Sequence, residues 1–292
     1  MTTCIAAVCD WGSAIVLIAD KMIGMGYVES ELEVTKMREI HKNWWMLFAG
    51  DDISPVFDIV DYAKEGIGDG EATIGDVQKA VEIAFARKRM ELAVLTHLTP
   101  IGWDIERFND QGSQKLPDFE QLKEKINDFG LSIELLVAGF DGNKGYVFSM
   151  FGEGQGKGIP SRLDIPGFQS IGSGSTVANF MLYYREMRVG TPVREAVFYA
   201  LEAKYTAEQA SGVGSSTDLF VARPNKELIQ ISDEDVVEKS LIPICYSLSP
   251  NLLKREHFTT LNNIPELHGF PEVKKEEKKK KPKPQKMPNP MP

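Results

Sequence analysis

The chain of 292 residues lacks the features that several common classes of protein require. It has no run of about 18 or more consecutive apolar residues, so no membrane-spanning helix is expected. Its beginning lacks a basic segment followed by an apolar stretch and a small-residue cleavage site, so no secretory signal is predicted. Apolar residues still make up 42% of the chain, which is enough for a substantial core.

Cysteine and histidine are scarce, and neither is clustered. The three cysteines form no CxxC pair and suit free thiols in a reducing cytosol, which predicts a cytoplasmic protein. The four histidines are scattered, so neither a metal nor a cofactor is expected. A G-x-S-x-G elbow, a P-loop and a dinucleotide-binding fingerprint are also missing.

The charge is divided unevenly along the chain. Residues 274–292 contain eight lysines and two glutamates, a net charge of +6. The whole-chain charge of −9 therefore leaves −15 for residues 1–273, and an acidic body argues against nucleic acid as the main ligand. The tail 274–292 is rich in proline and has no apolar pattern, so we expect it to be disordered.

Apolar runs separated by turn residues predict β-hairpins, and therefore antiparallel sheets. The runs are 2–8, 14–19, 44–49, 134–140, 146–151, 218–222 and 227–231. Most of them are apolar on both faces, which indicates that each sheet is covered on both sides.

Helical patterns supply that cover. Start signals occur at Ser54-Pro55, Ser175 and Thr191-Pro192, and residues 76–95 have apolar residues at helical spacing. Two helix pairs with hairpin sheets predict an α+β fold of four layers, helix–sheet–sheet–helix.

The predicted domain covers residues 1–240. Within it, residues 98–128 are interpreted as an insertion on the second helix, with a short helical run from Pro117. A C-terminal extension, 241–273, precedes the lysine-rich tail 274–292.

The residue after the initiator is a threonine. Methionine is usually removed before a small residue, which would give Thr2 a free α-amine beside its hydroxyl. Such an amine titrates near ~8 and can accept the hydroxyl proton. The nucleophile also needs a nearby cation, a carboxylate that positions the cation, and backbone N–H groups for the oxyanion. Candidates at strand ends are Asp20, Lys36 and Gly50.

This arrangement resembles the proteasome β-type subunits of the N-terminal-nucleophile (Ntn) hydrolase superfamily. The resemblance rests on Thr2, Ala19-Asp20, Lys36 and Phe48-Ala49-Gly50-Asp51, and it extends through 134–151 and the 171–175 loop. The opening Met-Thr-x-Cys and the 213–219 segment are most similar to Anbu-type bacterial proteasome homologues. The resemblance implies a four-layer Ntn-hydrolase sandwich over roughly residues 2–232, the insertion excepted.

The resemblance also implies a role for each matching residue. Thr2 would be nucleophile and base, Lys36 the tuning cation, Asp20 its partner and Gly50 the oxyanion donor, while Ser173 would hold the amine. Because the first turn is two residues longer than usual, Thr3 is the alternative nucleophile, and Thr2 is favoured because removal of Met1 alone exposes it.

Two further sets of residues follow from the same comparison. The family's supporting Asp-x-x-Ser-Gly-Gly segment is not intact, and its nearest match places Glu208 and Ser211 in the catalytic set. Ile23, Val34 and Phe48 would line the pocket for an apolar substrate side chain.

The resulting prediction is a threonine endopeptidase that hydrolyses peptides or unfolded proteins through an acyl-enzyme. The resemblance implies a homo-oligomeric ring or stack, and an ATPase or other regulator is a possible partner that the sequence alone does not decide. Two alternatives remain open: a non-catalytic structural subunit, and an Ntn amidase acting on small-molecule amides.

Overall fold

The computed structural model describes residues 2–25, 28–31, 35–154, 157–210 and 213–231, without the side chains of 23–25 and 28–31. The predicted extension 241–273 and the tail 274–292 lie outside the described residues. Within the described ranges, no helix combines the length and the apolar character needed to cross a membrane.

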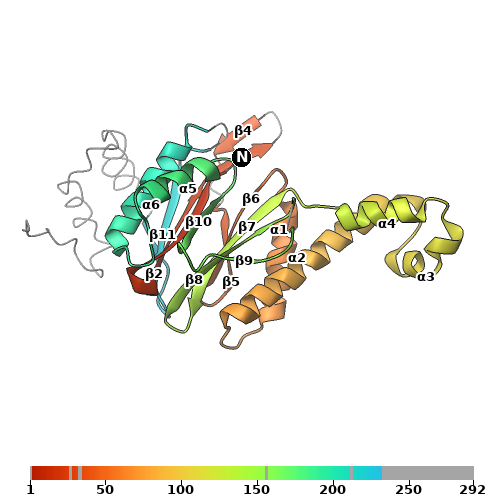
Figure 1. Cartoon of the computed structure of the whole chain (residues 1–292), viewed down its shortest axis with the longest axis horizontal. Coiled ribbons are helices and arrows are strands. Elements are labelled where there is room, and N and C mark those ends of the chain that lie inside the picture. The colour runs from red at the N-terminus through yellow and green to blue at the C-terminus, as the bar shows by residue number, and fades with distance from the viewer. Residues whose placement is uncertain (1, 26–27, 32–34, 155–156, 211–212, 232–292) are drawn as a thin grey trace, which may run out of the picture.

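Two five-stranded antiparallel sheets form the centre of the molecule (Figure 1). The first has the order β10-β1-β2-β11-β12 and the second β5-β6-β7-β8-β9. The strands of the first sheet are β1 (Cys4–Cys9), β2 (Ala14–Asp20), β10 (Phe168–Ile171), β11 (Thr217–Ala222) and β12 (Ile229–Gln230). The strands of the second sheet are β5 (Met37–His41), β6 (Trp44–Gly50), β7 (Ile133–Asp141), β8 (Lys144–Phe151) and β9 (Ser161–Arg162). A separate two-stranded hairpin is formed by β3 (Met22–Met25) and β4 (Val28–Glu31).

Helices cover the outer face of each sheet. The pair α1 (Ser54–Ile67) and α2 (Ile74–His97) shares a core with the second sheet. The pair α5 (Ser175–Tyr184) and α6 (Val193–Ala207) shares one with the first. A third core lies between the sheets. The predicted α+β fold with four layers is therefore confirmed.

The pleat of β1 shows why its six residues are all buried. Successive side chains of a strand point to opposite faces, so a strand between two cores is apolar on both. Ile5, Ala7 and Cys9 pack in the core against α5 and α6. Cys4, Ala6 and Val8 pack in the core between the sheets. A continuous apolar run is therefore the expected signature of this strand.

The helices begin where the start signals predicted, but the residues there do not cap them. Ser54 is the first residue of α1, and the residue before it, Ile53, makes no side-chain cap; the N–H of Ser54 donates to the Asp52 carboxylate at 2.9 Å. Neither Ser175 at the start of α5 nor Pro192 before α6 provides a side-chain cap. The capping box lies instead at α2, where the Thr73 hydroxyl accepts from the N–H of Asp76.

The predicted insertion is a helical extension at the far end of α2 (Figure 1). It contains α3 (Ile105–Lys115) and α4 (Phe119–Asp128), although the sequence predicted helix only from Pro117. The extension has its own small core, which includes Ala93, Leu98, Phe108, Leu122 and Ile126. It therefore folds against the end of α2 rather than against the sheets.

Candidate active site

The principal predicted catalytic residues lie at strand ends, where the two sheets meet. Thr2 comes just before β1, and Asp20 is the last residue of β2. Lys36 comes just before β5, Gly50 ends β6, and Ser173 follows β10. Antiparallel pairing returns alternate strand ends to the same edge of a sheet, so these residues are close in space despite their separation in sequence.

A buried ion pair lies against the Thr2 side chain. The Lys36 Nζ donates to the Asp20 Oδ1 at 3.0 Å and also to the Thr2 Oγ1. Thr2, Asp20 and Lys36 are 3%, 0% and 2% exposed. A buried ammonium is costly unless a carboxylate pairs with it, and Asp20 supplies that partner. The pair thus holds a positive charge against the Thr2 oxygen, where it would stabilise negative charge on that oxygen.

Backbone N–H groups fix the Asp20 carboxylate. Its Oδ1 accepts from the N–H of Thr3 at 3.2 Å, and its Oδ2 accepts from the N–H of Gly214 at 2.9 Å. Three donors, including the Lys36 ammonium, therefore define its orientation. Asp20 is in place to orient Lys36 toward Thr2.

The loop after β10 contacts the backbone of Thr2. The Thr2 N–H donates to the Ser173 Oγ at 3.3 Å, and the N–H of Gly174 donates to the Thr2 carbonyl at 3.4 Å. Ser173 thus contacts the nitrogen that would become the α-amine on removal of Met1.

Gly172 gives a first test of this close contact. Its φ is +89°, and a Cβ there would lie 2.1 Å from the Thr2 carbonyl oxygen. We expect Gly172→Ala to lower the free energy of unfolding by more than the roughly 1–2 kcal/mol of left-handed strain alone. Chemical denaturation measures this change. Gly102→Ala is the matched control, because Gly102 has a left-handed φ of +75° and open space around its Cβ position. Equal losses in the two variants would contradict the close approach to Thr2.

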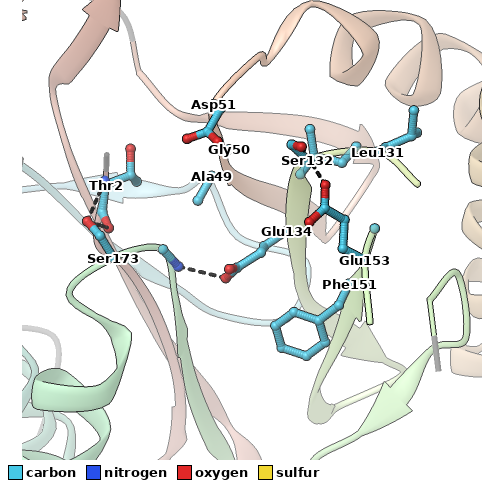
Figure 2. Close-up of a pocket in the computed structure, with 13 residues that line it drawn as sticks. Thr2, Ala49, Gly50, Asp51, Leu131, Ser132, Glu134, Phe151, Glu153 and Ser173 are labelled. Atoms are coloured by element: carbon cyan, nitrogen blue, oxygen red, sulfur yellow. Dashed lines mark hydrogen bonds between the residues drawn. The ribbon is translucent and has the colours of Figure 1, made fainter. Parts of the chain in front are cut away.

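A pocket of about 240 Å³ opens beside Thr2 (Figure 2). Gly50 and Ser173 line it together with the start of β7 and the end of β8. A Cβ on Gly50 would lie 2.4 Å from the Ser132 carbonyl oxygen, so only glycine fits between β6 and this segment. The pocket gives a substrate access to the hydroxyl that Lys36 contacts.

The sequence analysis missed the acidic wall of the pocket. Asp51, Glu134 and Glu153 line it. Asp51 was noted only as part of the resemblance, and Glu134 only as a strand residue. A charged residue at the start of an otherwise apolar run, as Glu134 is in the predicted strand 134–140, was the available signal.

The structure distinguishes between the two candidate threonines. The Lys36 Nζ contacts Thr2, whereas the Thr3 Oγ1 is buried and has no hydrogen-bond partner among the described residues. Gly174 packs against that oxygen, since a Cβ on Gly174 would lie 2.0 Å from it. Of the two threonines, Thr2 is therefore the one that contacts Lys36.

Cys4 is a nearby group that could be mistaken for a nucleophile. Burial raises the pKa of its thiol far above the ordinary value, and the charge of Asp20 raises it further. Its Sγ donates to the Phe48 carbonyl at 3.5 Å. A neutral, fully buried thiol does not attack a substrate.

The residues predicted to support the nucleophile are only partly described. Glu208 forms an ion pair with the fully buried Lys204 at 2.5 Å. The Lys204 Nζ also donates to the Ser215 carbonyl at 2.7 Å, and Gly214 beside it donates to Asp20. Ser211 lies outside the described residues. A role for Glu208 or Ser211 beside Thr2 stays a prediction.

Of the three residues named for the apolar substrate pocket, only Phe48 has a described side chain, and the structure contradicts its assignment. Phe48 is fully buried in the core between the second sheet and α1 and α2, and it does not line the pocket beside Thr2. The pleat of β6 explains this, because Trp44, Met46 and Phe48 point to the helices and Trp45, Leu47 and Ala49 to the other sheet. Ile23 belongs to β3, but its side chain is outside the described part of the structure, as is Val34.

The described part of the chain holds no group of three or more His, Cys, Asp or Glu side chains suited to a metal ion. The fold and the site together define a four-layer α+β sandwich with a threonine, a lysine and an aspartate clustered beside a pocket.

No protein-family model matches the chain, and a search of curated proteins also finds no match.

Proposed function

We propose that this chain is a threonine peptidase of the proteasome-like Ntn-hydrolase type that acts in the cytoplasm. The single observation that carries the proposal is a pair of contacts: at a buried site next to a pocket, the Lys36 Nζ contacts both the Thr2 Oγ1 and Asp20. The sequence resemblance to proteasome β-type subunits is an independent argument for the same activity.

The proposed reaction begins with removal of Met1, which makes the Thr2 nitrogen an α-amine. This amine takes the hydroxyl proton while the Thr2 oxygen attacks the peptide carbonyl. Positive charge on Lys36 stabilises the attacking oxygen, and the N–H of Gly50 is the proposed donor to the oxyanion. Collapse of the tetrahedral intermediate breaks the C–N bond, and the amine of the leaving peptide receives the proton. An ester of Thr2 with the acyl part of the substrate remains.

Water completes the cycle. The free α-amine of Thr2 accepts a proton from a water molecule, the resulting oxygen attacks the ester, and the C–O bond to Thr2 breaks. Thr2 regains its proton, and the peptide acid leaves. In keeping with the resemblance, we propose that the chain works in a homo-oligomeric ring or stack with a possible ATPase or regulator.

Comparative hydrolysis tests this proposal against its two alternatives. Purified full-length protein is incubated with an unfolded protein, with short peptides and with small-molecule amides, each with and without a threonine-directed β-lactone. We expect β-lactone-sensitive cleavage of peptide bonds. Cleavage of small amides alone would indicate an amidase, and no cleavage of any substrate would indicate a structural subunit.

A further inference from the structure

The pocket beside Thr2 has an unbalanced set of charges. Among the described residues, its ionisable lining consists of Asp51, Glu134 and Glu153, with no lysine, arginine or histidine. Lys36, the cation that contacts the Thr2 hydroxyl, is compensated by Asp20 at 3.0 Å. The pocket therefore presents net negative charge to whatever occupies it.

Glu134 is the pocket carboxylate that is hydrogen-bonded to the loop beside Thr2. It reaches from β7 toward the loop that carries Ser173, as Figure 2 shows. Its Oε2 accepts from the N–H of Gly172 at 2.8 Å, and the next residue, Ser173, accepts from the Thr2 N–H. This contact fixes the carboxylate on the wall of the pocket and leaves its second oxygen able to accept from a ligand.

The other two carboxylates flank the same opening. The Glu153 Oε1 accepts from the Ser132 Oγ at 2.5 Å, and the N–H of Asp51 donates to the Ser132 carbonyl at 3.1 Å. The carboxylates are spread around the pocket, and they do not form a group suited to a metal ion in the described structure. Carboxylates spaced around a cavity of about 240 Å³ suit an elongated organic cation better than a single ion.

We infer that this pocket is a specificity subsite for a cationic group of the substrate, with Glu134 as its main determinant. The group is a lysine or arginine side chain, or the α-ammonium of a peptide, next to the bond that Thr2 cleaves. The inference rests on the proposed peptidase activity and adds the class of substrate. Opposite charges at a partly desolvated site favour binding and guide encounter, and salt weakens both effects.

Matched peptides test this inference. Each position around the cleaved bond carries either lysine or norleucine, which has a similar length and no charge, and each peptide is made with a free or an acetylated N-terminus. We expect kcat/KM about tenfold higher for one cationic form, the lower end of what a charged hydrogen bond contributes. The preference should shrink at high ionic strength.

Glu134→Gln is the informative variant, because its amide oxygen can still accept from Gly172 while the charge is removed. It should lower kcat/KM for the preferred cationic peptide about tenfold more than for the neutral peptide. Glu120→Gln, an exposed change on α4 in the helical extension, is the matched control and should leave the preference intact.

Labelling of Thr2 by an uncharged β-lactone distinguishes failure of the subsite inference from failure of the peptidase proposal. Labelled enzyme with no preference for a cationic peptide at any position would overturn the subsite and leave the peptidase proposal standing. Full retention of the preference in Glu134→Gln would also overturn the inferred subsite, because Glu134 is its main determinant, and would leave the peptidase proposal standing. No labelling of Thr2 would overturn the peptidase proposal, and the subsite with it.

Discussion

Replacement of Thr2 with alanine is expected to reduce peptide hydrolysis by a factor of about 10³ or more, because it removes the attacking oxygen and leaves the rest of the site in place. Thr2 contributes the only hydroxyl that Lys36 contacts among the described residues. Initial rates of peptide cleavage by the wild type and the variant, at equal concentration of folded protein, measure the loss.

Thr2→Ser is the matched control for this change. Serine keeps both a hydroxyl and, after removal of Met1, an α-amine, so we expect measurable activity. Cys4→Ala is a second control, since the buried Cys4 thiol takes no part in the proposed reaction. Thr2→Ala enzyme with undiminished activity would refute Thr2 as the nucleophile.

Lys36→Met is expected to lower the free energy of unfolding by about 3 kcal/mol, because removal of one member of a buried ion pair leaves the other charge uncompensated. The N–H groups of Thr3 and Gly214 still bind the Asp20 carboxylate, which places the loss at the lower end of the usual range. Chemical denaturation of both proteins measures the difference.

A double-mutant cycle isolates the ion pair itself. Asp20→Asn in the Lys36→Met background should cost less than in the wild type, since the carboxylate is then already unpaired. We expect a coupling energy on the order of 1–3 kcal/mol. Additive effects of the two changes would contradict the contact between Lys36 and Asp20.

Much of the fold could be predicted from the periodicity of apolar residues in the sequence. The runs that became β1, β2 and β6 are apolar on both faces, and burial between two cores explains that pattern. Strand β5 was missed, because the adjacent charged residues Arg38 and Glu39 interrupt its apolar pattern. Helix α3 was missed because only Phe108 and Gly112 of its eleven residues are buried, so its apolar stripe is narrow.

The candidate site was predictable to a different degree at each residue. Thr2, Asp20 and Lys36 could be named because their spacing resembles a known family, and the structure brings them together. Phe48 was assigned to a substrate pocket, but the sequence could not say which face of β6 it occupies. Glu134 was missed because its contact with Gly172 joins segments 38 residues apart, which local patterns do not reveal.

The intact mass of the purified full-length protein, measured before and after treatment with a β-lactone, tests the central claim most directly. We predict a starting mass lower by one methionine and a single adduct that peptide mapping places on Thr2, with no adduct in Thr2→Ala. Met1 retained on the protein, or an adduct that persists in Thr2→Ala, would contradict an N-terminal threonine nucleophile.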